Sequence, residues 1–273
     1  MGDGMIYDCF PFFNELELLN IRLNELGDTV DKFVLIEADR TFSNKLKPFY
    51  FTERRAFFDR WKERIVVVNA ALKPEGPWQI EAAQRELAWE ALRRLGAKPN
   101  DVLMLSDVDE IPSANAVKIG LEHVADGDVC CEQRMYQYYL NSFIGDGWRG
   151  TRLATVEQIE RNKWTMQELR HKEPKVLLKN AGWHFGFMGG SERISTKIKS
   201  YAHTEFDLPQ YTNIEGIESR MKAGGDPFDR SLAIVKKAAT VPLDELPAYV
   251  EDNPNIFAGW LKPSEEGEPS ETR

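Results

Sequence analysis

Apolar residues recur with two different periods in the first 112 positions, and the two periods alternate along the chain. Leu16, Leu19, Leu23 and Leu26 are three or four positions apart, which is the spacing of one face of an α-helix. Short apolar runs, typical of buried strands, lie on both sides of such segments. We expect strands at 5–12, 32–39, 64–70 and 101–107, and helices at 14–27 and 77–96. The alternation predicts an α/β fold with a mostly parallel central sheet flanked by helices.

Local signals mark the ends of several elements. Pro77 suits the first turn of the helix at 77–96, and Gly96 suits its C-terminal stop. The helix at 14–27 is expected to begin at Asn14. The strand at 101–107 is apolar on both faces, so we place it in the middle of the sheet.

The second half is less regular. Ser113 is a candidate N-cap for a helix at 114–124. We also expect strands at 128–141 and 175–187, and a helix at 191–206 that begins at Ser191. The stretch at 141–175 has no clear hydrophobic period. The pattern predicts one domain over residues 1–262 and a disordered tail at 263–273.

Composition excludes several classes of protein. With 42% hydrophobic and 29% charged residues and no apolar run near the ~20 residues of a membrane span, no membrane-crossing segment is expected. A net charge of −9 with no basic aromatic patch argues against a nucleic-acid partner. The sequence starts without a signal-peptide pattern, and Cys9, Cys130 and Cys131 have no metal-type or disulfide-type spacing. These features favour a cytoplasmic protein.

The segment DVLMLSDVDEIPS, residues 101–113, passes from a buried strand into a cluster of acids. In an extended chain Asp107 and Asp109 point the same way, and the carboxyl edge of a parallel sheet is where ligands bind. Two unpaired carboxylates repel each other, and a divalent cation removes that repulsion while leaving coordination sites for phosphate oxygens. We therefore expect a metal site; the alternative is that the acids only cap the helix after Pro112.

Two enzyme classes place D-x-D at a strand end. Haloacid-dehalogenase-type phosphatases carry D-x-D-G-T on their first strand, whereas here the pair follows the fourth expected strand and leads into Ile111 and Pro112. Nucleotide-sugar glycosyltransferases of the GT-A type place D-x-D after a βαβαβ unit that holds the nucleoside. The order of elements in this sequence favours the second class.

Four stretches together resemble glycosyltransferase family 17: YDCFPFFNELELLNIRLNEL, DKFVLIEADRTFSN, LMLSDVDEIPS and AGWHFGF, followed by LPAYVEDNP. The resemblance implies a GT-A fold, a UDP-N-acetylglucosamine donor, Mn²⁺ or Mg²⁺, a glycan acceptor and inversion at the anomeric carbon. It also implies a nucleotide-binding half at about 5–112 and an acceptor half at about 113–262. Membrane-anchored members carry a transmembrane segment and stem that this sequence does not show, so an enzyme acting on another glycan is expected.

The resemblance assigns Asp107 and Asp109 to the metal and the nucleotide sugar. We expect Asp109 to bind the metal directly and Asp107 to reach the ribose or the metal through water. His184, in GWHF, is a candidate third metal ligand, since a neutral imidazole binds transition metals well. The alternative is a hydrogen-bonded core histidine, and His203 is the competing ligand.

Other residues are candidates for the donor. Glu37, at the end of the second strand, is placed to accept the uracil N3–H, or is a surface acid beside Arg40. Arg85 is placed to hold the acids or a phosphate with its guanidinium, or lies on a solvated helix face. Asn14 is expected to direct helix N-terminal donors toward the nucleotide, or to serve only as a cap.

The acceptor side needs a base and a sugar-binding surface. Inversion requires deprotonation of the acceptor hydroxyl, and Glu192 is the expected base, with Glu110 and Glu205 as substitutes. A helix-dipole role is the alternative for Glu192. Trp148 and Trp164, which flank a polar stretch, are expected to stack on the acceptor sugar unless they only pack.

Two other functions fit the same pattern. A nucleotidyltransferase uses a similar half-sheet and acidic metal site, but normally shows a glycine-rich phosphate loop near the first strand, and CFPFFNE contains no glycine. A non-catalytic glycan-binding protein needs the same pocket, so the sequence does not distinguish it from the transferase.

Overall fold

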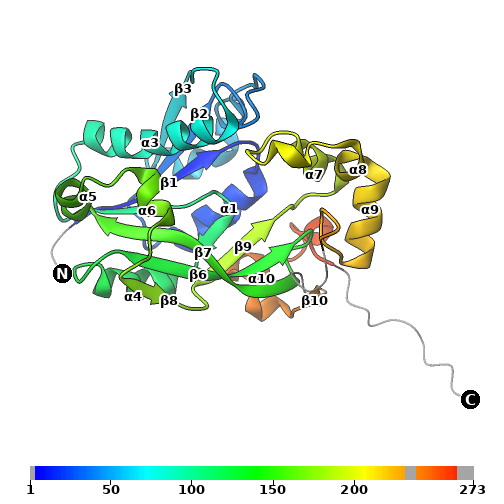
Figure 1. Cartoon of the computed structure of the whole chain (residues 1–273). Helices are drawn as coiled ribbons and strands as arrows, with labels where there is room; N and C mark the ends of the chain where they lie inside the picture. Colours follow the sequence, from blue (N-terminus) through cyan, green and yellow to red (C-terminus); the bar gives the residue numbers. More distant parts are fainter. Residues whose placement is uncertain (1–3, 231–237, 263–273) are drawn as a thin grey trace, which may run out of the picture.

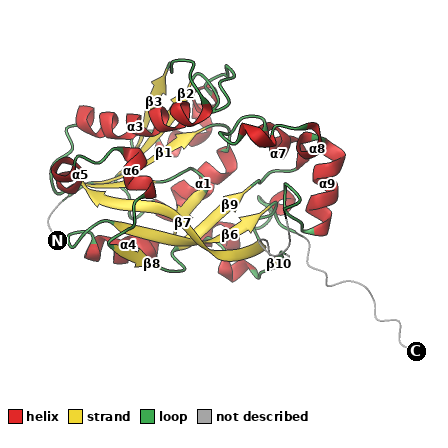
Figure 2. Ribbon diagram, in the orientation of Figure 1, coloured by secondary structure: helices red, strands yellow, loops and turns green. Residues whose placement is uncertain are grey.

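The computed structural model describes residues 4–230 and 238–262, and the expected tail at 263–273 lies outside them. One mixed, mostly parallel sheet runs through these residues (Figures 1 and 2). Its strand order is β3 (Ile65–Ala70), β2 (Lys32–Ala38), β1 (Ile6–Phe12), β4 (Val102–Leu105), β7 (Ser142–Thr155), β6 (Val129–Gln137), β9 (Gly182–Gly186), β5 (Glu110–Pro112). The expected α/β fold is confirmed.

The first half matches its predicted order closely. Strands β3, β2, β1 and β4 are parallel neighbours, and β4 is central because β1 lies on one side of it and β7 on the other. Helix α1 (Leu16–Leu26) packs with α4 (Ala114–His123) on one face of the sheet. Helices α3 (Pro77–Leu95), α5 (Val156–Asn162) and α6 (Met166–His171) cover the other face (Figure 2).

Most predicted caps are confirmed. Pro77 begins α3, Gly96 ends it in the left-handed region at φ 73°, and the Ser113 hydroxyl accepts a hydrogen bond from Ala116 N at 3.1 Å. The start of α1 was predicted wrongly, because Glu15 and not Asn14 precedes its first turn and Asn14 makes no side-chain cap. The Glu15 carboxylate instead accepts from the backbone N–H groups of Phe13 and Asn14.

The second half differs from the prediction in three places. The stretch at 141–175 contains the long strand β7 and helices α5 and α6. The strand expected at 175–187 is two strands, β8 (Val176–Leu178) and β9, because the chain turns at Asn180 (φ 51°) and Gly182 (φ 137°). A Cβ at residue 182 would lie 2.3 Å from the Ile111 carbonyl oxygen, so only glycine allows β9 to pair with β5 there. The helix expected at 191–206 ends at Ile198, and α7 (Ser191–Ile198) is followed by an aromatic cluster that includes Tyr201 and Phe206.

Short elements complete the described chain. They are α2 (Tyr50–Arg54), η1 (Arg55–Trp61), η2 (Thr204–Phe206), α8 (Pro209–Thr212), α9 (Ile214–Ala223), β10 (Ala239–Thr240), η3 (Leu243–Glu245), α10 (Ala248–Asp252) and η4 (Ala258–Trp260). Helix α10 lies against α1, where Val250 and Phe257 pack on Leu18 and Ile21. Across the described ranges, no helix combines the length and the apolar character that a bilayer crossing requires. Cys9, Cys130 and Cys131 are all buried and free.

Candidate active site

A cavity of about 540 Å³ opens at the carboxyl ends of β1 and β4. It is lined by the loops after these strands, by α3, by the facing side of β6 and β9, and by α7. This is the edge at which parallel sheets of this type bind ligands. Asp107, Asp109, Arg85, His184 and Trp148 all line it, so five of the residues selected from the sequence meet in one place.

Asp107 is held by arginines. Nη2 of Arg85 donates to both carboxylate oxygens at 2.9 and 3.1 Å, and Nη2 of Arg170 lies 3.9 Å from Oδ2. Burial alone raises the pKa of Asp107, but the guanidinium groups of Arg85 and Arg170 outweigh it and hold the pKa far below its usual range. Arg85 also pairs with Glu81 one turn earlier on α3. The expectation that Arg85 reaches the acids therefore matches its position.

Asp109 is held by a lysine. Nζ of Lys197, from α7, lies 2.6 Å from Oδ2 of Asp109. Burial lowers the pKa of Lys197, but Asp109 and then Glu15 outweigh it, so the net shift is upward and the ammonium stays charged. The two carboxylates thus each have a cationic partner, and the expectation that they lie side by side unpaired is wrong.

Glu110 is a structural anchor in this arrangement. It is fully buried, and its carboxylate accepts from Trp148 Nε1 at 2.7 Å, from the backbone N–H of Asp107 at 2.9 Å and from Arg170. A carboxylate with this many donors is not free to take a proton from an acceptor. Its substitute role as a base is therefore not supported.

His184 lies in the cavity with its ring stacked on Trp148, at 4.1 Å between centroids and 16° between planes. Burial lowers its pKa, with Asp109 and Glu110 opposing, so the imidazole is neutral near pH 7. A neutral ring beside two carboxylates has the right chemistry for a transition-metal ligand. His203 also lines the cavity, but its Nδ1 lies 2.7 Å from Glu205 and its ring meets the edge of Trp78.

These residues fit a divalent metal only in one way. In the described ranges no three His, Cys, Asp or Glu side chains are grouped closely enough to hold an ion by themselves. Mg²⁺ and similar ions commonly use one or two carboxylates and complete their shell with phosphate oxygens and water. A metal that arrives with a diphosphate satisfies this requirement, provided that Lys197 releases Asp109.

Four predicted residues lie elsewhere. Glu37 is fully buried and accepts from the first backbone N–H groups of α2, including Phe51 N at 2.8 Å, so it neither faces the cavity nor lies on the surface. Asn14 does not line the cavity, and Glu192, which is exposed on α7, does not line it either. Trp164 is half-buried and packs against the core cluster that includes residues of α3 and α6, with Lys172 Nζ 4.5 Å from its ring.

The cavity also contains residues that the sequence analysis missed. Glu15 lies three positions after the end of β1, so the strand-end argument used for Asp107 could have pointed to it. Lys197 and Arg170 carry no such local signal, because they reach the acids from helices far along the chain. Trp78, 47% exposed, also lines the cavity.

Comparison with known proteins identifies the family of this chain. The sequence matches "Glycosyltransferase family 17" over residues 3–259. It is 31% identical over 112 residues to the human "Beta-1,4-mannosyl-glycoprotein 4-beta-N-acetylglucosaminyltransferase", covering 38% of this chain and 21% of that protein. The rat protein of the same name gives the same identity and coverage. The matched segment is thus about a fifth of these relatives' length.

Solved structures are only distantly similar. "Crystal structure of 4-diphosphocytidyl-2C-methyl-D-erythritol synthase" superposes with a TM-score of 0.42 at 12% identity, over 64% of this chain and 89% of that one. HddC from Yersinia pseudotuberculosis gives 0.38 at 11% identity, over 68% and 90%. The family match covers nearly the whole chain, and it includes the D-x-D segment and the strands that position it. The chain belongs to glycosyltransferase family 17.

Proposed function

We propose that this chain transfers N-acetylglucosamine from UDP-N-acetylglucosamine to a hydroxyl group of a glycan, with a divalent metal and with inversion of the anomeric carbon. Family membership supports the class of reaction, and the N-acetylglucosaminyltransferase relatives support the donor sugar. One observation carries the proposal. At the carboxyl end of the central strand β4, Asp107 forms an ion pair with Arg85 and Asp109 forms one with Lys197.

The chain's own cations suit a nucleoside diphosphate. Arg85, Arg170 and Lys197 all line the cavity, and all three contact the D-x-D acids. When the donor bond breaks, negative charge develops on the departing diphosphate, and fixed cations stabilise it. A guanidinium can bind a phosphate through two parallel hydrogen bonds, which also orients it.

Asp107, Asp109 and His184 are the residues that would hold Mn²⁺ or Mg²⁺. A bound divalent ion would act as a Lewis acid toward the diphosphate. Before any ion binds, Arg85 orients the Asp107 carboxylate and Lys197 orients that of Asp109. Both side chains are therefore positioned at the cavity before a ligand arrives.

The acceptor is proposed to lie against the aromatic wall of the same cavity. Trp148 is 36% exposed and lines the cavity, whereas Trp164 does not, so only the first of the two predicted tryptophans supports this placement. Trp78 adds a second exposed ring. Flat aromatic rings pack against the C–H faces of sugars.

Inversion needs a base within reach of the acceptor. Glu192 is outside the cavity, and among the acids that line it Glu81, Asp107 and Asp109 are in ion pairs. Glu15 lines the cavity without a counter-ion within 4.0 Å, judged over the described residues, and burial raises its pKa. A carboxylate with a raised pKa is a better base, so we assign this role to Glu15 in place of Glu192.

The test uses Asp109→Asn, with the exposed Asp126→Asn as the matched control. The purified chain is incubated with UDP-N-acetylglucosamine, Mn²⁺ and a mixed oligosaccharide acceptor, and released UDP is measured by mass spectrometry. Transfer and donor hydrolysis should fall at least about a hundredfold in Asp109→Asn, since a lost metal ligand removes several kcal/mol of charge stabilisation. The control should be unchanged.

Thermal unfolding gives an independent measurement on the same proteins. UDP with Mn²⁺ should stabilise the wild type more than Mn²⁺ alone, and should not stabilise Asp109→Asn. Full activity in Asp109→Asn would remove the metal assignment. Absence of any UDP-sugar turnover in the wild type, with stabilisation by glycan alone, would replace the transferase by a glycan-binding protein.

A further inference from the structure

A second cavity, of about 580 Å³, lies on the opposite face of the sheet from the candidate active site. Successive side chains on a strand point to opposite faces of the sheet, and this alternation separates the two cavities. On β6 and β9, Arg134 faces Trp183 and both line the second cavity, whereas the next pair, Met135 and His184, line the first. Among residues 4–230 and 238–262, none lines both cavities. The volume is in the range typical of small-molecule sites.

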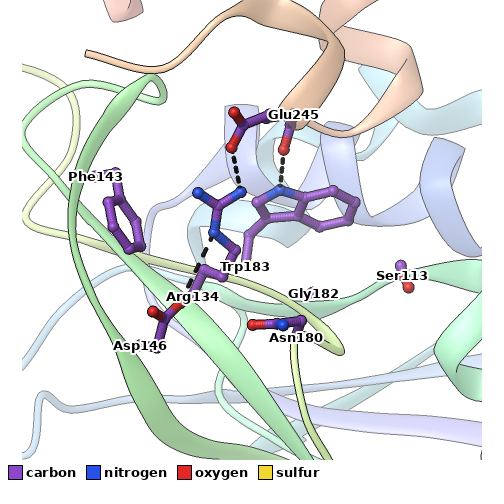
Figure 3. A pocket seen from close by; sticks show the side chains of 8 residues that line it. All are labelled: Ser113, Arg134, Phe143, Asp146, Asn180, Gly182, Trp183 and Glu245. Carbon is purple, nitrogen blue, oxygen red and sulfur yellow. Dashed lines mark hydrogen bonds and ion pairs between the residues drawn. The ribbon is translucent and has the colours of Figure 1, made fainter. Parts of the chain in front are cut away.

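Arg134 forms the fixed centre of this cavity (Figure 3). Its guanidinium pairs with Glu245 of η3 at 2.5 Å, lies 3.9 Å from Asp146 of β7, and stacks over the Phe143 ring at 4.6 Å. Trp183 is held beside it, because its indole Nε1 donates to the Glu245 carbonyl at 2.8 Å. Four segments, β6, β7, β9 and η3, therefore meet at one group of charged and aromatic side chains.

The cavity also offers unused hydrogen-bonding groups. The Asn180 side-chain amide has no partner elsewhere in the described chain, and Asp146 has 59% of its side chain exposed. Ser113 accepts a hydrogen bond as a helix cap, which leaves its hydroxyl proton available. One positive and two negative side chains line the space, so its charge disfavours phosphate or carboxylate ligands.

We infer that this second cavity binds a neutral oligosaccharide. Sugars need ring surfaces for their C–H faces and a mixture of amide, carboxylate and hydroxyl groups for their hydroxyls. Trp183 and Phe143 supply the rings, and Asn180, Asp146 and Ser113 supply the polar groups. The inference does not depend on the proposed transfer reaction, because it uses none of the residues of that site.

The test titrates two neutral probes, chitotriose and mannotriose, into the full chain and follows their signals by saturation-transfer NMR. Asp146→Ala removes an exposed polar group, and Trp183→Ala removes a ring that is also partly packed in the core. Asp126→Ala, at an exposed turn that lines neither cavity, is the matched control. Affinity should fall at least about fivefold in Trp183→Ala and measurably in Asp146→Ala, and the control should equal the wild type.

Each outcome decides the inference. Binding that is weakened by Asp146→Ala, and that persists when UDP and Mn²⁺ are added, supports it even if Trp183→Ala fails to fold. Binding that UDP displaces and that neither variant affects places the sugar in the first cavity, which overturns the inference. Failure of the wild type to bind both probes overturns it as well.

Discussion

The acids of the D-x-D segment are neutralised by cations from different helices. Arg85 comes from α3, Arg170 from α6 and Lys197 from α7. The repulsion between the Asp107 and Asp109 carboxylates, which we expected a metal to relieve, is therefore already relieved by these cations. A metal entering this site competes with an ammonium group for Asp109.

Lys197→Met tests this competition. Two unit charges 4 Å apart interact by roughly 4 kcal/mol at an effective dielectric constant of 20, so removing the ammonium should tighten Mn²⁺ binding at least about tenfold without nucleotide. Mn²⁺ electron paramagnetic resonance measures the affinity directly. Lys199→Met, an exposed lysine two positions along, is the control. Unchanged Mn²⁺ affinity in Lys197→Met would mean that the ion does not use Asp109.

Glu15→Gln tests the assignment of the base. The variant should lose about a hundredfold to ten-thousandfold in kcat, the usual contribution of a general base, and keep its stabilisation by UDP and Mn²⁺. Burial raises the pKa of Glu15, so the acidic limb of the wild-type rate profile should lie above that of an ordinary glutamate and disappear in the variant.

Glu192→Gln is the matched control, since Glu192 is exposed and outside the cavity. A large loss in Glu192→Gln with normal activity in Glu15→Gln would return the role to Glu192.

At the scale of elements, local signals were reliable and tertiary contacts set the remaining boundaries. Gly96 and Ser113 end and begin their helices as predicted, because caps depend on backbone geometry within a few residues. Asn14 is not the cap because the helix begins at Leu16, with Glu15 in the cap position, and the Asn14 backbone N–H donates to the Glu15 carboxylate. Glu37 is at a strand end as expected, yet it faces the start of α2, which the sequence analysis did not predict.

Glu110 joins three elements, so we expect its replacement to lower the free energy of unfolding strongly. It lies in β5, accepts from Trp148 of β7 and pairs with Arg170 of α6, and its side chain is fully buried. Glu110→Gln removes the nearer carboxylate partner of Arg170 and leaves only Asp107, at 3.9 Å; breaking a buried pair costs about 3–5 kcal/mol. Urea denaturation, monitored by circular dichroism, measures the free energy of unfolding.

Glu90→Gln makes the same chemical change in an exposed pair with Arg94 and should cost less than about 1 kcal/mol. Equal losses in the two variants would contradict the anchoring role of Glu110.

At the scale of the whole molecule, one sheet carries two cavities with different chemistry. The first has three cations beside the D-x-D acids and suits a nucleoside diphosphate, and the second is framed by one arginine, two acids and aromatic rings. Strand alternation keeps them on opposite faces, so each can be altered without touching the lining of the other. The family match extends over both halves of the chain, and strands from both halves form the single sheet.

The sequence by itself determined the order of strands and helices in the first half, the central position of β4, most helix caps and the place of the D-x-D acids. These features follow from side-chain period and from interactions within a few residues. The tertiary structure alone decided which cations meet those acids, that Glu110 is an anchor, and that Glu37, Trp164 and Glu192 lie away from the cavity. The physical reason is sequence separation: Lys197 and Asp109 are 88 positions apart, and only the folded sheet and α7 bring their side chains into contact.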